Sequence, residues 1–210
     1  MPLAAWLTFA AIALGMVLTP GPNMAYLVSR SICQGRAAGL ISLGGVALGF
    51  IVYMLLAAFG VTALLFAIPY AYDALRLCGA GYLAWMGWNA LRPGGVSPFT
   101  VTALAADSPR KLFAMGLLTS LFNPKVAALY LSLLPQFIDR EAGAILHQTL
   151  LLGATQIAIS ICFNAIFVLA AGAIAAFLTG RPVWGMVQRW LMGGVLGALA
   201  VRMALDSGRR

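Results

Sequence analysis

The chain has 210 residues, of which 62% are hydrophobic and only 9% are charged. Soluble domains carry about one quarter charged residues, so this composition excludes an ordinary soluble protein and predicts an integral membrane protein with the lipid bilayer as its solvent. The net charge of +8 does not indicate nucleic-acid binding, because no basic run is interleaved with aromatic residues.

Six apolar segments are long enough to cross a bilayer, which takes about 20 helical residues. They are residues 3–28, 37–67, 72–91, 112–134, 144–178 and 187–205. The fifth is long enough to tilt or to contain a break. Residues 29–36 are expected to form a short basic loop. The sequence thus predicts an all-α membrane protein with six transmembrane helices.

A polar connection at residues 93–111 divides the chain into two halves, residues 1–92 and 112–210. Each half holds three predicted helices, and because three is odd, the second half must cross the membrane inverted relative to the first. Inverted three-helix repeats occur in many secondary transporters, whose substrate sites lie at the interface between the repeats.

Positively charged residues are concentrated after the first, third and fifth predicted helices. Cytoplasmic loops carry the excess of Lys and Arg, so this pattern predicts that both termini lie outside the cytoplasm. Arg202, Arg209 and Arg210 near the C-terminus oppose that orientation. The first segment is not expected to be a cleaved signal peptide, since Arg30 is the first basic residue.

A first interruption of the apolar pattern is the run Thr19-Pro20-Gly21-Pro22-Asn23. Its two prolines leave the carbonyls of Met16 and Leu18 without helical donors, its glycine adds backbone freedom, and its asparagine side chain both donates and accepts. These groups match the ammonium and carboxylate of an amino acid. An ordinary proline kink is the alternative interpretation, but the double proline favours a binding site.

A second interruption, Asn123-Pro124-Lys125, lies about one hundred residues later, in the other half. Pro124 frees the carbonyl of Ser120. Lys125 lies near the middle of its span, where a lysine costs ~3 kcal/mol on insertion scales, so a polar cavity is expected around it. There it could meet a substrate carboxylate or carry a coupling proton. The alternative is that it reaches an interface or pairs structurally with carbonyls.

Other polar residues add to this constellation. Gln156 and Asn164 lie eight residues apart on one face of the fifth helix, as candidates to line the same pathway or to hydrogen-bond between helices. The predicted spans contain no Asp or Glu except Asp73, near the end of the third, which leaves Lys125 and Asp73 as candidates for proton coupling.

Neither catalytic residues nor a metal or cofactor site is expected. An intramembrane enzyme needs a nucleophile with a base, paired acids or a His-rich site, whereas His147 is the single histidine and the three cysteines are isolated. A non-transporting structural protein leaves the two matching breaks unexplained. Gly-x-x-x-Gly pairs at residues 35–39, 45–49 and 193–197 allow close helix approach, either in a homodimer or within one bundle.

The first proline run resembles the signature of the LysE/RhtB amino-acid exporters. Further similarity lies in Gly35-Arg36 before Gly39, in Cys78-Gly79-Ala80-Gly81-Tyr82-Leu83 before Gly87, and in Phe113, Gly116 and Asn123-Pro124-Lys125 ahead of Leu134-Pro135-Gln136-Phe137. The resemblance implies a bacterial inner-membrane exporter of amino acids, driven by the proton motive force and without an ATPase partner. Members of this family export either basic or neutral amino acids.

The absence of acids from the interior of the predicted spans favours a neutral substrate such as threonine or homoserine over a basic one, which would lack a counter-charge. The predicted mechanism is alternating access around a site between the halves. In it, Asn23 and Asn123 orient the amino acid while one half rocks against the other.

Overall fold

Every regular element in the described part of this computed structural model is a helix, which confirms the all-α prediction. The structure describes residues 1–59 and 106–179, together with single positions from 77 to 92 and from 183 to 205. Most of the third and sixth predicted helices, most of the polar connection and Asp73 lie outside these residues. The six-helix count and the complete inverted repeat therefore stay predictions.

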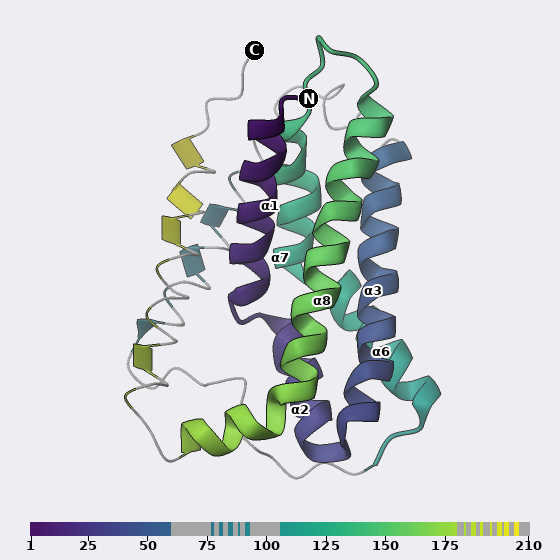
Figure 1. The fold of residues 1–210 in the computed structure, drawn as a ribbon, viewed down its shortest axis with the longest axis vertical. Coiled ribbons are helices and arrows are strands. Elements are labelled where there is room, and N and C mark those ends of the chain that lie inside the picture. The colour runs from purple at the N-terminus through teal and green to yellow at the C-terminus, as the bar shows by residue number, and fades with distance from the viewer. Residues whose placement is uncertain are drawn as a thin grey trace.

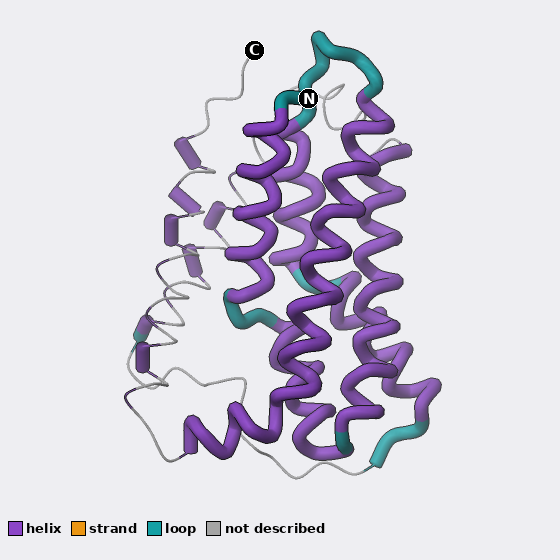
Figure 2. Tube along the Cα trace, viewed as in Figure 1, coloured by secondary structure: helices purple, strands orange, loops and turns teal. Residues whose placement is uncertain are grey.

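The first predicted helix is broken into α1 (Leu3–Leu18) and α2 (Pro22–Gln34), which are bent by 50° relative to each other. Pro22 stands at the first position of α2, where its missing N–H would have no intrahelical partner in any case. The tube in Figure 2 shows the break as a loop between two helical stretches.

The fourth predicted helix is broken in the same way. Helix α6 (Pro109–Leu121) is followed by α7 (Pro124–Ala127), which continues as the π-helical η1 (Ala128–Leu133) and the 3₁₀-helical η2 (Leu134–Phe137). This pair is also bent by 50°. Both proline–asparagine interruptions thus break their helices.

Two unbroken helices, α3 (Arg36–Phe59) and α8 (Ile145–Thr179), lie beside the broken pairs (Figure 1). Both are long and apolar enough to cross a membrane, and the described spans number four if each bent pair is one span. Large apolar side chains such as Leu7, Leu55 and Ile166 are exposed on the outside, as expected where lipid is the solvent. The chain is a multi-pass membrane protein.

The two broken helices run in opposite directions. In Figure 1, α1 and α2 descend from the end of the bundle that holds the N-terminus, whereas α6 and α7 ascend toward it. This antiparallel relation is what inverted halves require.

Helices α3 and α6 touch through their backbones. A Cβ atom on Gly45 would lie 2.0 Å from the carbonyl oxygen of Phe113, and one on Gly116 would lie 2.2 Å from that of Ser42. Only glycine allows this approach. The Gly45-x-x-x-Gly49 pair therefore serves packing within the bundle, and a homodimer stays a prediction.

Two predicted loop boundaries were wrong. Residues 29–34 continue α2, and the turn into α3 is made by Gly35 alone, at a φ of +89° that favours glycine. Residues 109–111 begin α6 behind Ser108, whose side chain accepts a hydrogen bond from the amide of Lys111. Polar composition at these positions marks the ends of spans, and helices continue beyond them.

Candidate functional site

The two breaks meet at the side chain of Lys125. Its ammonium nitrogen donates to the carbonyl oxygen of Met16 at 2.8 Å and to that of Thr19 at 2.7 Å. The residue is only 9% exposed. It is the only charged residue that is buried in the described part of the chain. The lysine of the second break is thus held by the backbone of the first.

These contacts decide which freed carbonyls are used. The carbonyl of Met16 accepts from Lys125, but it also accepts from the amide of Thr19 at 3.3 Å and so is not left without a backbone donor. The second acceptor for Lys125 is Thr19 and not Leu18, because the chain turns to extended backbone at Thr19. The prediction for Ser120 was wrong, since its carbonyl accepts from the amide of Asn123 at 3.2 Å. In this conformation Lys125 pairs with carbonyls, the structural alternative considered from sequence.

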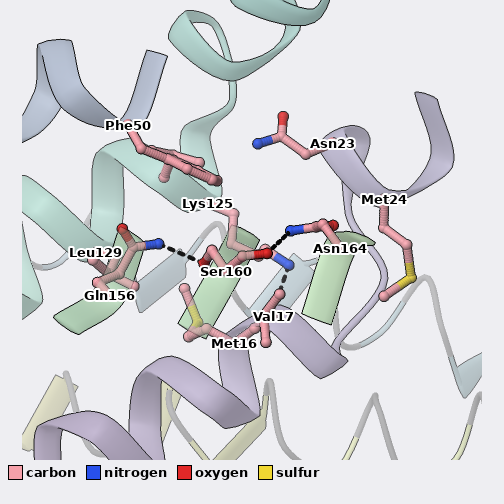
Figure 3. Close-up of a pocket in the computed structure, with 11 residues that line it drawn as sticks. Met16, Val17, Asn23, Met24, Phe50, Lys125, Leu129, Gln156, Ser160 and Asn164 are labelled. Carbon is pink, nitrogen blue, oxygen red and sulfur yellow. Dashed lines mark hydrogen bonds between the residues drawn. The ribbon is translucent and has the colours of Figure 1, made fainter. Parts of the chain in front are cut away.

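A small pocket lies where α1, α2, α3, α7 and α8 meet. Polar side chains line one part of it: Asn23, Lys125, Gln156, Ser160 and Asn164. Apolar side chains line the rest: Met16, Val17, Met24, Phe50, Val126 and Leu129. Figure 3 shows Lys125 and the polar side chains of α8 converging from different elements. The structure thus gathers four predicted residues at one cavity, namely Asn23, Lys125, Gln156 and Asn164.

The polar residues of α8 form a connected ladder. Gln156 donates to the hydroxyl of Ser160 at 2.8 Å, and Asn164 donates to the carbonyl of Ser160 at 2.7 Å. Tyr130 donates to the side-chain oxygen of Gln156 at 2.5 Å, which fixes the orientation of that amide. The ladder therefore presents preset polar groups to the pocket.

Asn23 differs from this ladder, because its side-chain oxygen has no hydrogen-bond partner among the described residues although the residue is only 6% exposed. A buried acceptor without a donor costs about 1–3 kcal/mol. Asn23 is also the second residue of α2, whose N-terminus has no side-chain cap. Figure 3 shows its amide without a contact to the other residues drawn. The pocket therefore offers an unused acceptor beside a helix N-terminus.

Asn123 has a different role from the one expected. Its side-chain oxygen accepts from the amide of Lys125 at 3.0 Å and so caps α7. Its side-chain nitrogen is buried without a partner among the described residues, but Asn123 is not on the pocket lining, which α7 reaches through Lys125 and Val126. Together with Pro124, it fixes the start of the helix that carries the lysine.

The pocket is small. Its cavity volume is about 30 Å³, which holds two or three water molecules at about 10–15 Å³ each. An amino acid therefore needs a more open conformation, or movement of the side chains that fill the site.

A charged cluster joins α2 to α6 at the end of the bundle opposite the N-terminus (Figure 1). Asp107 pairs with Arg30 and with Lys111, and it exchanges two hydrogen bonds with Gln34. Hydrogen bonds from Lys111 and then Gln34 hold the pKa of Asp107 below its ordinary value. This cluster ties the first half to the start of the second. No pattern in the sequence indicated this cluster.

Ser160 was the polar lining residue missed from sequence. It lies four residues from both Gln156 and Asn164, so helical spacing alone places it on their face. The apolar lining residues carried no such signal, because apolar side chains that face a pocket are of the same types as those that face lipid.

The chain is similar to known efflux proteins over nearly its whole length. A leucine efflux protein of Klebsiella pneumoniae subsp. pneumoniae is 29% identical over 199 residues, which cover 95% of this chain and 94% of that protein. Leucine efflux proteins of an Enterobacter species and of Salmonella typhimurium are 29% and 28% identical, each aligned over 94% of this chain. No solved structure matches the chain.

The family model of the LysE type translocators matches residues 14–207, a range that includes both helix breaks and the whole pocket. This protein therefore belongs to the LysE type translocator family.

Proposed function

We propose that this protein is a secondary carrier that exports neutral amino acids across the bacterial inner membrane, driven by the proton motive force. The observation that carries the proposal is the meeting of two helix breaks at one buried lysine, each break bent by 50°. Half-helix ends of this kind bind charged groups of substrates in secondary transporters.

The two half-helix ends suit a zwitterion. Helix α1 ends in carbonyl oxygens and α2 begins with uncapped amides, so the partial charge of the backbone is negative at one end and positive at the other. An α-amino acid carries its ammonium and its carboxylate on the same carbon atom, so the two groups lie close together. The break therefore binds both groups, with Asn23 as a further acceptor for the ammonium.

The side-chain preference follows from the apolar part of the lining. The sequence alone favoured threonine or homoserine, with a basic substrate as the alternative. Six apolar side chains line the pocket, and no Asp or Glu is among its lining residues, so a cationic side chain would lack a counter-charge. The relatives are named for leucine efflux. We therefore place neutral amino acids with aliphatic side chains first.

Transport is proposed to proceed by alternating access around this pocket. The backbone contact between α3 and α6 joins the two halves and resists sliding, which favours movement of the half-helices at their breaks. The basic end of the described bundle, with Arg30, Arg36 and Lys111, is assigned to the cytoplasm. The N-terminus then lies outside it. Lys125 is the proposed coupling residue.

The test is transport by the purified protein in liposomes. Vesicles loaded with labelled leucine, threonine or lysine are compared with protein-free vesicles under an imposed proton gradient. Leucine should leave fastest, and its rate should fall when the gradient is dissipated. Efflux of lysine alone contradicts the neutral-substrate proposal. Gradient-driven efflux retained by Lys125→Met excludes Lys125 as the coupling residue.

A further inference from the structure

We propose that Lys125 occupies the ammonium site of the substrate while the carrier is empty, and that an incoming zwitterion displaces it. This inference rests on the proposed function, because it concerns the same pocket. It makes Lys125 a specificity-determining residue that selects ligands with both an ammonium and a carboxylate group.

The geometry of Lys125 carries the inference. Its ammonium contacts the carbonyl oxygens of Met16 and Thr19 at 2.8 and 2.7 Å. These oxygens lie at the C-terminal end of α1, where the carbonyls of the last turn lack their usual helical donors and bind cations. The carbonyl of Met16 also accepts from the amide of Thr19 at 3.3 Å, and its second lone pair serves the lysine. The ammonium of an amino acid carries the same three N–H donors as that of lysine. Both cations therefore fit the same two oxygens, and only one can be bound at a time.

The displaced lysine has a new partner close by. Its nitrogen would lie 3.0 Å from a Cβ atom on Gly21, the N-cap of α2, so it already stands beside the start of that helix. A substrate carboxylate bound at the uncapped amides of α2 would lie between those amides and Lys125. The unpartnered oxygen of Asn23 is available to the substrate ammonium. Every displaced donor thus regains an acceptor, and the net charge of the pocket is unchanged.

A primary amine without a carboxylate meets a different situation. It can take the two carbonyls only by displacing Lys125, and it offers that lysine no anion in return. Two cations would then share a buried pocket whose lining contains no Asp or Glu, an arrangement that repulsion and desolvation oppose. The lysine therefore excludes simple amines, while it accepts amino acids.

The experiment measures ligand binding to the purified full chain in detergent by calorimetry. The ligands are leucine, 3-methylbutylamine, which lacks the carboxylate, and 4-methylpentanoate, which lacks the ammonium. Wild type should bind leucine and reject the amine. Lys125→Met should bind the amine about tenfold or more tightly than wild type does, the value of one charge-assisted hydrogen bond. Lys125→Arg keeps the cation and should still reject the amine.

Lys125→Gln is a second neutral variant, for the case that Lys125→Met does not fold. Its amide can still donate to the carbonyls without carrying a charge. It should also gain amine binding. If both neutral variants fold and reject the amine as wild type does, the placeholder role is overturned while amino-acid export stands. If wild type neither binds nor transports any amino acid but the neutral variants gain the amine, the proposed function fails and the cation site is supported.

Discussion

The ammonium nitrogen of Lys125 lies 2.8 Å from the carbonyl oxygen of Met16, 109 residues earlier in the chain. This contact joins the two helix breaks, so the lysine of the second break depends on the first for its polar partners. An unpaired buried lysine would be costly in a membrane protein. Changes at either break should therefore alter the same site.

Gly21→Ala should impair transport without unfolding the protein. The glycine is extended, with a φ of −156° that alanine adopts freely, but the new Cβ atom would lie 3.0 Å from the ammonium nitrogen of Lys125. The lysine must move by a few tenths of an ångström, which weakens charged hydrogen bonds worth about 1.5–3 kcal/mol each when intact. Initial-rate efflux from liposomes should fall by up to about tenfold.

The control for this variant is Gly172→Ala in α8, where a Cβ atom would meet no atom within 4 Å. It should transport as wild type does. Equal rates for Gly21→Ala and wild type would show that the position of Lys125 on the two carbonyls does not matter for transport.

The site was only partly predictable from sequence. Proline chemistry indicated both breaks, because a missing N–H is a local property. That the lysine takes Thr19 and not Leu18 depends on the 50° bend and on how α7 approaches α1. Such tertiary geometry has no local signal. For the same reason, the N-capping role of Asn123 was missed.

Gly45→Ala should destabilise the fold strongly. The added Cβ atom would lie 2.0 Å from the carbonyl oxygen of Phe113 and 2.8 Å from the amide nitrogen of Leu117. Both are backbone atoms, so α3 and α6 must separate, and overpacking of this kind costs about 1–3 kcal/mol or more. The midpoint of thermal unfolding in detergent should fall.

The neighbouring Gly44→Ala provides the matched control. Its nearest contact would be the ring of Phe113 at 3.4 Å, and alanine is favoured over glycine in a helix by about 0.5–1 kcal/mol. Its midpoint should equal or exceed that of wild type. If the two variants behave alike, the backbone contact between α3 and α6 is not what makes glycine necessary.

Asp107→Asn should reduce the loss of fold stability at acid pH. Hydrogen bonds from Lys111 and Gln34 lower the pKa of Asp107 in the folded protein. A carboxyl whose folded pKa lies below its unfolded value of about 4 stabilises the fold above that value, and the stabilisation is lost as the pH falls through the folded pKa. Between about pH 7 and about pH 3, the unfolding midpoint of wild type should therefore fall further than that of the variant.

Glu141→Gln removes one negative charge from an exposed position outside this cluster, and it should keep the wild-type profile. A parallel profile for Asp107→Asn and wild type would mean that the link between α2 and α6 adds no pH-dependent stability.

The prediction of helices depended on hydrophobicity and therefore failed at polar helix ends. Ser29 to Gln34 have the composition of a loop, yet they continue α2, where Arg30 and Gln34 reach Asp107. A helix satisfies its own backbone in water as well as in lipid, so its end need not coincide with the edge of the apolar run. The partner that stabilises this extension lies 77 residues away from Arg30, beyond the reach of local patterns.

Phe50→Leu should shift substrate preference toward larger side chains. Phe50 lines the apolar part of the pocket and is 3% exposed, so a smaller residue adds space where the substrate side chain is proposed to lie. A buried large-to-small replacement of this kind costs less than the about 3–5 kcal/mol of a Phe→Ala truncation, and the fold is expected to tolerate it. In liposome counterflow, the ratio of phenylalanine to leucine uptake should rise several-fold, since one methylene in an apolar pocket is worth about 1–3 kcal/mol.

Phe59→Leu changes the same residue type at the 73% exposed end of the same helix, and it should leave the ratio unchanged. An unchanged ratio in both variants would place the substrate side chain elsewhere, whereas an equal rise in both would point to a general effect on α3.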